Sequence, residues 1–373
     1  MKIVADDKIP FLRGVLESQA KIVYLPGDQI SAKDLHDADG LIVRTRTKCN
    51  ANLLNGSKVQ FIATATIGFD HIDTHYCAEN GIIWRNAPGC NSGSVMQYIV
   101  AALLQIANYK KYQLSDKTLG VVGVGNVGSK VVAAAQALGI KVLQNDPPRE
   151  RKEGSGDFVP LSEVLTQSDI ITFHVPLNQG GDDNTRHLLN YKKMTSLKKG
   201  AIIINTSRGE IVDNHALKAA IIQEFVDEAV LDVFEKEPEI DQDLLCMLLL
   251  GTPHIAGYSA DGKANGTAMS VQAMSRHFGL NLDNWYPEDV PEPANPVIEV
   301  KNDEPQKVLT DIISHTYTIV QDDDNLKTNP RQFEQLRGNY PLRREFPAYT
   351  VVNNKLAPAL LKTIKNLGFK VQQ

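Results

Sequence analysis

The sequence has few cysteines and no long apolar run, and both absences narrow what the protein can be. Its four cysteines lie far apart, with no Cys-x-x-Cys spacing, so we expect free thiols in a reducing compartment and no metal site. The longest apolar run, residues 244–250, is far shorter than the roughly 20 residues of a membrane-spanning helix. No charged-then-apolar leader opens the chain. We therefore expect a cytoplasmic protein.

A basic stripe is also absent. The chain has 39 lysines and arginines against 44 aspartates and glutamates, a net charge of −5, whereas nucleic-acid binding needs clustered positive charge. Neither a nucleic acid nor a membrane is therefore expected as a partner. With 42% apolar and 22% charged residues, the composition is that of a globular protein. A length of 373 residues predicts two or three domains.

Short apolar runs alternate with helical, polar-faced stretches over residues 1–90, which is typical of a doubly wound parallel sheet in an α/β fold. Helices are expected at 11–19 and 72–80. A long helix over 94–108 then leads into a second block with the same alternation. The predicted strands are 3–5, 22–25, 41–43, 61–63 and 82–84 in the first block, and 119–122, 141–143, 170–173, 201–205 and 229–233 in the second.

The composition changes after Trp285. Residues 286–296 are rich in proline and acidic side chains, which indicates a linker. Beyond it, strand-like and helix-like runs predict a small α+β module, of a kind that more often serves assembly or regulation than catalysis. The predicted strands are 297–300 and 348–352, and the predicted helices are 304–320 and 358–367.

A glycine-rich loop predicts a dinucleotide site. The strand over 119–122 leads into Gly-x-Gly-x-x-Gly and a helical stretch, where the glycines permit a tight turn, the approach of a pyrophosphate and close helix packing. An acid 18 positions after the last glycine is placed to bind the ribose hydroxyls and repel a 2′-phosphate, which favours NAD. Arg149 nearby keeps NADP as the alternative. The residues expected to bind the cofactor here are Gly123, Gly125, Asn126, Val127, Gly128 and Asp146.

Three reactive side chains follow later strands, at the edge where open parallel sheets bind ligands. Arg208 offers two parallel hydrogen bonds to a carboxylate. His254 is the natural base for an alcohol proton at neutral pH. Glu237, 17 residues earlier, would hold the imidazole and stabilise its charged form. Each alone is more often a surface ion-pair partner or a loop histidine, but behind a dinucleotide loop the set predicts a dehydrogenase.

These segments resemble the D-isomer-specific 2-hydroxyacid dehydrogenases over about residues 1–285. The resemblance rests on His-Val-Pro-Leu at 174–177, the block 205–213 and Thr-Pro-His at 252–254. It implies that Arg208, Glu237 and His254 are the catalytic residues. It also implies a flavodoxin-like substrate domain (1–93 with 256–285) and a Rossmann NAD domain (94–255), leaving 286–373 as a third domain. Residues implied to line the nicotinamide and its ribose are Val175, Thr206, Ser207, Arg208, Asp232 and Gly257.

Two strand ends in the first block predict substrate contacts. Thr45 and Thr66 offer hydroxyls, and Arg44 and Arg46 offer positive charge for a phosphate, although a basic run is often only a solvated face. Passages at 68–73, 86–91 and 254–259 resemble one family member that oxidises a phosphorylated four-carbon hydroxy acid. That likeness implies Tyr258 as a substrate contact.

The tail, around 333–345, resembles the C-terminal dimerisation domain of the same family member, so a homodimer is expected. Two alternatives stay open. One is a 3-phosphoglycerate dehydrogenase, a cousin with a similar cleft. The other is a non-catalytic protein that binds NAD(H) and senses it, because such proteins can retain the catalytic set.

Overall fold

The computed structural model describes residues 1–341, 343–352 and 356–372. The chain forms two compact units, Met1–Asn91 with Ser259–Pro291, and Ser92–Tyr258 with Glu292–Gln373. Each unit holds an all-parallel sheet covered by helices, which confirms the predicted α/β fold class. The predicted three-domain division remains a prediction.

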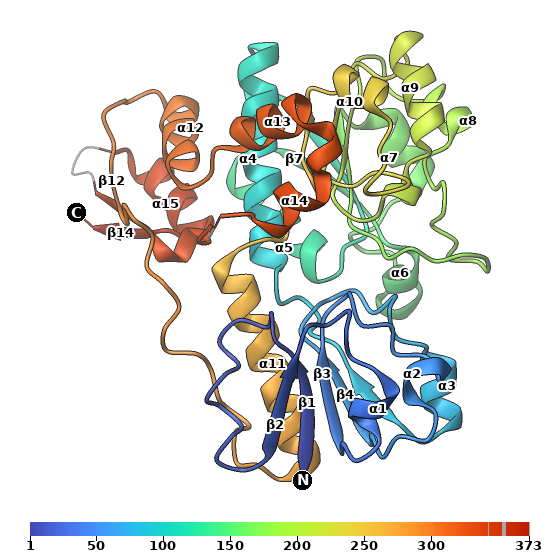
Figure 1. Ribbon diagram of the computed structural model, residues 1–373. Helices are drawn as coiled ribbons and strands as arrows, with labels where there is room; N and C mark the ends of the chain where they lie inside the picture. The colour runs from blue at the N-terminus through green and yellow to red at the C-terminus, as the bar shows by residue number, and fades with distance from the viewer. Residues whose placement is uncertain (342, 353–355, 373) are drawn as a thin grey trace. The chain divides into compact units, whose positions relative to one another are not determined.

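The first unit has a five-stranded sheet of order β2-β1-β3-β4-β5. Its inner strands β1, β3 and β4 are apolar and buried on both faces because helices cover both faces (Figure 1). Along β1, Ile3 and Ala5 face α11, while Val4 faces the side of α1 to α3. The elements are β1 Lys2–Asp6, β2 Lys21–Leu25, α1 Ala32–Leu35, β3 Gly40–Val43, α2 Ala51–Leu54, β4 Phe61–Thr64, α3 Thr74–Glu79, β5 Ile83–Arg85 and α11 Ala260–Phe278.

The helix predicted over 11–19 is wrong, because this stretch is a chain of turns. Phe11 has a φ of 62° and Gly14 a φ of 85°, and a right-handed helix cannot pass through such residues. The Glu17 carboxylate instead accepts the backbone N–H groups of Gly14 and Leu16, at 2.9 and 3.0 Å. Apolar spacing alone did not reveal this local competition for backbone groups.

The second unit has a six-stranded sheet of order β11-β10-β9-β8-β6-β7. The strand order reverses between β6 and β8, and open sheets bind ligands beyond the carboxyl ends of the strands at such a point. Helices α4 and α5 pack on one face, and α7 to α10 on the other. The elements are α4 Ser92–Lys110, β6 Thr118–Val122, α5 Asn126–Ala137, β7 Lys141–Asn145, α6 Pro147–Glu153, α7 Leu161–Gln167, β8 Ile170–Phe173, α8 Tyr191–Met194, β9 Ile202–Asn205, α9 Asn214–Ile222, β10 Glu228–Leu231, α10 Gln242–Met247 and β11 Leu250–Gly251.

The tail belongs to the core of this second unit. In Figure 1 its orange and red helices lie against α4 and α5. The rings of Tyr98 on α4 and Tyr317 in the tail are 6.1 Å apart, and Thr363 donates a hydrogen bond to the Ala137 carbonyl at 3.0 Å. Its elements are β12 Val297–Glu299, α12 Pro305–Thr316, α13 Ile319–Thr328, α14 Phe333–Gly338, β13 Thr350–Val352, α15 Pro358–Asn366 and β14 Lys370–Gln372.

The single helix predicted over 304–320 is two helices, α12 and α13, because Tyr317 between them is extended, with a φ of −156°. All four cysteines are free thiols, as expected. Among the residues described, no helix combines the length and apolar character needed to cross a membrane.

Candidate active site

The glycine loop has the geometry that a dinucleotide requires. Gly123 has a φ of 87°, a conformation that other residues rarely adopt. A Cβ on Gly128 would lie 1.9 Å from the Gly123 carbonyl oxygen, so α5 packs directly on the turn. A Cβ on Gly125 would meet no atom within 4 Å. Open space therefore lies at the N-terminus of α5, beside Asn126 and Val127, where an anion is favoured.

Asp146 ends the neighbouring strand β7 and is tied to this loop. Its carboxylate accepts the backbone N–H of Val124 at 2.8 Å and that of Arg149 at 3.1 Å. Arg149, the residue that left NADP open, is paired through its Nη2 and Nε atoms with the Glu153 carboxylate at 2.6 and 2.9 Å. Because its charge already has a partner, the site fits the unphosphorylated ribose of NAD better than a 2′-phosphate.

The predicted base and its carboxylate partner lie together. His254 Nδ1 and Glu237 Oε2 are 2.7 Å apart, and the other Glu237 oxygen accepts the Phe234 N–H at 2.9 Å. Burial by itself would raise the pKa of Glu237, but the hydrogen bond and charge of His254, with the Phe234 N–H and Arg337, outweigh it and hold the pKa below its ordinary value. Glu237 is therefore ionised at neutral pH and orients the histidine ring.

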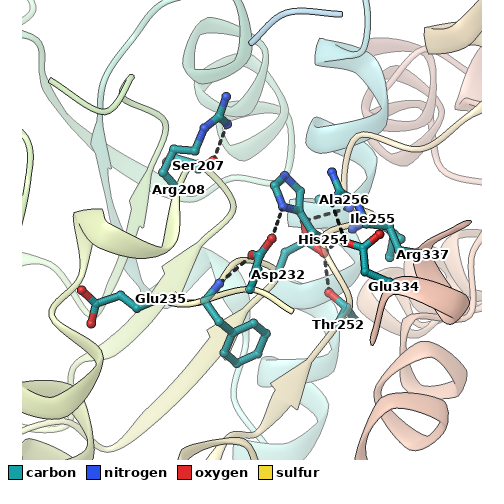
Figure 2. A network of polar contacts seen from close by, with 12 residues as sticks. Ser207, Arg208, Asp232, Glu235, Thr252, His254, Ile255, Ala256, Glu334 and Arg337 are labelled. Carbon is teal, nitrogen blue, oxygen red and sulfur yellow. Dashed lines mark hydrogen bonds and ion pairs between the residues drawn. The ribbon is translucent and has the colours of Figure 1, made fainter. Parts of the chain in front are cut away.

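The Asp232 carboxylate holds the chain on both sides of His254 by hydrogen bonds. This carboxylate accepts the Thr252 hydroxyl at 2.6 Å and the N–H groups of Ile255 and Ala256 at 2.8 and 2.9 Å, as Figure 2 shows. Asp232 is 1% exposed, and burial raises its pKa despite these partners. These hydrogen bonds all join Asp232 to residues of the protein itself. The expected contact between Asp232 and the nicotinamide ribose stays a prediction.

Arg208 follows β9 in a turn built by a buried asparagine. The Asn205 side chain accepts the Ser207 N–H at 3.1 Å and donates to the Arg208 carbonyl at 2.9 Å. The Arg208 guanidinium bends back to the Ser207 carbonyl at 2.8 Å (Figure 2). Asn205 was not among the expected site residues, although an asparagine ending a fully apolar strand was a usable signal.

Two of the remaining residues expected near the nicotinamide, Val175 and Thr206, lie beside His174. Its Nδ1 lies 3.4 Å from the Thr206 hydroxyl and its Nε2 lies 3.0 Å from Thr172. Burial lowers the pKa of His174, so its ring is neutral. Val175 approaches the glycine loop, since its Cγ1 is 2.6 Å from a Cβ built on Gly123. Gly257 lies in the loop just after Ala256.

Tyr258 has an unexpected partner from the tail. Arg337 on α14 donates its Nε–H to the Tyr258 hydroxyl at 3.0 Å, and its charge also acts on Glu237. The Tyr258 ring packs edge-on against Tyr340, with centroids 6.1 Å apart. No signal in the sequence linked residues some 80 positions apart.

The predicted substrate contacts Arg44, Thr45, Arg46 and Thr66 all belong to the first unit. Thr45 and Arg46 are exposed, Arg44 donates to the Lys8 carbonyl at 3.1 Å, and the Thr66 hydroxyl donates to the Gly68 carbonyl at 2.9 Å.

A lysine missed by the sequence analysis lies near this basic run. Burial, and then the charge of Arg44, lower the pKa of Lys263 on α11. A half-buried lysine whose pKa is shifted by burial and by a neighbouring charge is a candidate functional residue.

A second cluster brings together His187, Asp213 and Glu235. His187 Nε2 is 2.8 Å from Glu235 and its Nδ1 is 3.6 Å from Asp213. The other Glu235 oxygen accepts the Asn214 N–H at 3.1 Å. These contacts join three loops of the second unit, and we assign the cluster a structural role.

Comparison with known families supports the chemistry of this site. Residues 99–256 match the family described as D-isomer specific 2-hydroxyacid dehydrogenase, NAD binding domain. Residues 290–368 match a domain family of unknown function. Two similar curated proteins are erythronate-4-phosphate dehydrogenases. That of Bacteroides fragilis is 51% identical over 95% of this chain and 100% of its own length. That of Porphyromonas gingivalis is 41% identical over 99% of this chain and 100% of its own length.

The chain belongs to the erythronate-4-phosphate dehydrogenase family. It is thus one of the D-isomer specific 2-hydroxyacid dehydrogenases, an oxidoreductase that uses NAD, and the predictions of family, reaction class and cofactor are confirmed. Solved structures agree. The D-lactate dehydrogenase of Aquifex aeolicus with NAD and lactic acid has a TM-score of 0.62 at 26% identity, covering 76% of this chain and 97% of its own. The NAD-bound 3-phosphoglycerate dehydrogenase of Entamoeba histolytica has a TM-score of 0.63 at 26% identity, with the same coverage.

Proposed function

We propose that this enzyme oxidises 4-phospho-D-erythronate with NAD to (R)-3-hydroxy-2-oxo-4-phosphooxybutanoate, a step in the biosynthesis of pyridoxal 5′-phosphate (vitamin B6). The observation that carries the proposal is the His254–Glu237 pair, 2.7 Å apart, in a chain 51% identical to an erythronate-4-phosphate dehydrogenase along that protein's whole length.

In the proposed mechanism, the glycine loop at the N-terminus of α5 and Asp146 would hold NAD, which would supply the acceptor for the C2 hydride. His254 Nε2 takes the proton of the C2 hydroxyl, which is possible because Nδ1 faces Glu237. Glu237, ionised at neutral pH, stabilises the positive charge that the ring then carries. Arg208 holds the C1 carboxylate and polarises the developing C2 carbonyl. The enzyme is then left with one proton on His254, which passes to water.

The substrate phosphate has candidate partners in the first unit. We propose that Arg44 or Arg46, after β3, attracts it together with Lys263, a half-buried lysine of α11 whose positive charge interacts with that of Arg44. Thr45 and Thr66 are proposed to supply hydroxyls to the substrate. Tyr258, whose hydroxyl accepts a hydrogen bond from Arg337, is a further proposed substrate contact.

We further propose that the enzyme acts in the cytoplasm as a homodimer built through its tail. The tail resemblance supports dimerisation, and light scattering on the intact protein tests it. A mass of twice 41.1 kDa supports the dimer, and a single chain's mass at micromolar concentration contradicts it.

The test of the reaction offers 4-phosphoerythronate and 3-phosphoglycerate separately and measures the single-turnover burst of NADH. Steady-state turnover is then followed by the 2-oxo product, in the presence of a 2-oxo acid that reoxidises bound NADH. We expect a strong preference for 4-phosphoerythronate. Preference for 3-phosphoglycerate would instead assign the enzyme to the alternative dehydrogenase, and the absence of turnover with both would favour an NAD(H)-sensing protein.

A further inference from the structure

His254 holds an unusual backbone conformation. Its φ is 57°, in the left-handed region that a residue with a side chain occupies at an energetic cost. Its N–H donates to the Asp232 carbonyl at 2.8 Å and to the Thr252 carbonyl at 3.0 Å. Such a conformation persists only where the neighbouring chain is firmly held, so the contacts of the following residues decide where the imidazole lies.

The next two residues are held on both sides. Their N–H groups donate to Asp232, as described above, and their carbonyl groups accept from a residue of the tail. Arg343 Nη2 donates to the Ala256 carbonyl at 2.8 Å and to the Ile255 carbonyl at 3.4 Å. The loop after His254 is therefore clamped between a buried carboxylate and a buried guanidinium (Figure 2 shows the carboxylate side).

Arg343 is itself buried against aromatic rings of the tail. It is 6% exposed, and its guanidinium carbon lies 4.0 Å from the centre of the Tyr317 ring. The hydroxyls of Tyr317 and Tyr340 both donate to one oxygen of Asp322, at 3.0 and 2.7 Å. The ring face and this carboxylate offset the buried positive charge.

Stability alone is a poor reason for this arrangement. Taking a guanidinium out of water is costly, and well-packed apolar residues often stabilise a core equally well. Within the described chain, the Nε and Nη1 atoms of Arg343 have no hydrogen-bond acceptor. The Nη2 hydrogen bonds all go to the loop that carries His254, which points to a role in shaping that loop.

We propose that Arg343 is a positioning residue for the dehydrogenase reaction, which holds the 254–256 loop so that His254 faces the substrate hydroxyl. The inference rests on the proposed role of His254 as the base. The tail then serves the catalytic loop of its own chain in addition to any part in dimerisation. A displacement of about 1 Å of a catalytic group lowers the rate on the order of a hundredfold. Loss of the Arg343 hydrogen bonds is therefore expected to lower mainly kcat.

The test compares Arg343→Met, which keeps an apolar contact with Tyr317 but loses the donor, with Arg343→Lys, which keeps charge and one donor nitrogen. The matched control is Arg331→Met, at an exposed position of the same tail. Steady-state kinetics give kcat and KM for both substrates, and hydrogen exchange with mass spectrometry follows the peptide that covers residues 252–258.

We expect Arg343→Met to lower kcat by about 10- to 100-fold with KM changed by less than about threefold, Arg343→Lys to show a smaller loss, and the control to match wild type. Exchange should rise at 252–258 and not across the rest of the second unit. Values of kcat within twofold of wild type in both variants, or equal loss in both, would overturn the proposal. Should the Met variant not fold, the Lys variant decides by the same twofold criterion.

The two proposals fail separately. If wild-type protein does not turn over 4-phosphoerythronate, the proposed function fails, and exchange at 252–258 still reports whether Arg343 holds the loop. If wild type is active but hydrogen exchange at 252–258 in both Arg343 variants is the same as in wild type, only the proposed role of Arg343 is refuted.

Discussion

At the scale of single residues, His254 combines a reactive ring with a costly backbone conformation. Asp232 and Arg343 hold the chain that follows it, and Glu237 holds the ring. The sequence identified His254 and Glu237 from residue type and from their places after strands. It did not identify Arg343, because contacts across some 90 positions leave no local pattern.

Replacing His254 tests the base. We expect His254→Ala to lower kcat by about 10²- to 10⁴-fold, the usual contribution of general base catalysis, with NAD affinity nearly unchanged. Turnover assays and fluorescence titration with NADH measure the two effects. His215→Ala, at an exposed histidine of α9, is the control. A comparable loss of NAD binding would show that His254 is structural.

Glu237→Gln tests the carboxylate through pH. The folded pKa of Glu237 is depressed, so its stabilising contribution is present above the ordinary glutamate pKa and is lost as pH falls through the depressed value. We expect the free energy of unfolding of this variant at pH 7 to be about 1.5–3 kcal/mol lower than that of wild type. The difference from wild type should shrink towards zero in acid, as measured by urea unfolding at a series of pH values.

The exposed Glu239→Gln variant provides the comparison, because it changes the same charge outside the site. A wild-type advantage over Glu237→Gln that does not depend on pH would contradict the ionised pair. In that case packing of the side chain, and not its charge, would carry the stabilisation.

At the scale of elements, the join between β6 and α5 is the part that the sequence predicted best. Its glycine spacing, its strand and its helix all lie within about 20 residues, where local rules decide the structure. The helix expected over 11–19 failed at the same scale, because the turns there depend on Phe11, Gly14 and Glu17 in combination. Local patterns are reliable where several of them agree.

Two glycines of the loop should respond differently to alanine. Gly128→Ala places a methyl group 1.9 Å from the Gly123 oxygen, so α5 must move, and we expect both NAD affinity and the melting temperature to fall. Gly125→Ala meets no protein atom, so we expect an NAD affinity at least about tenfold weaker at an almost unchanged melting temperature, because the methyl occupies the space of the pyrophosphate. Calorimetric titration and thermal unfolding separate the two. Unchanged affinity in Gly125→Ala would contradict the proposed position of the phosphates.

At the scale of the whole molecule, the tail shares a hydrophobic core with α4 and α5. Ile312, on α12, is 1% exposed within this shared core. We expect Ile312→Ala to lower the free energy of unfolding by about 2–5 kcal/mol, as for other buried large-to-small changes. Hydrogen exchange should rise in α5 and in α12 together.

Ile222→Ala, at a position 64% exposed, should change stability by less than about 0.5 kcal/mol. If Ile312→Ala raises exchange in the tail peptides alone, the tail unfolds as a separate module. The small independent domain predicted from the proline-rich linker would then describe it better than a shared core.

The sequence by itself determined the chemistry of this protein: an NAD loop, an arginine and a histidine–carboxylate pair, each legible because residue type and local spacing set its function. Only the tertiary structure decided how these groups are held. Three interactions join segments that are distant in the sequence. Lys263 interacts with the charge of Arg44, Arg337 donates to the Tyr258 hydroxyl, and Arg343 donates to the loop after His254. The reason is physical. A buried hydrogen bond or ion pair depends on where the folded chain brings its partners, and no short window of sequence contains both of them.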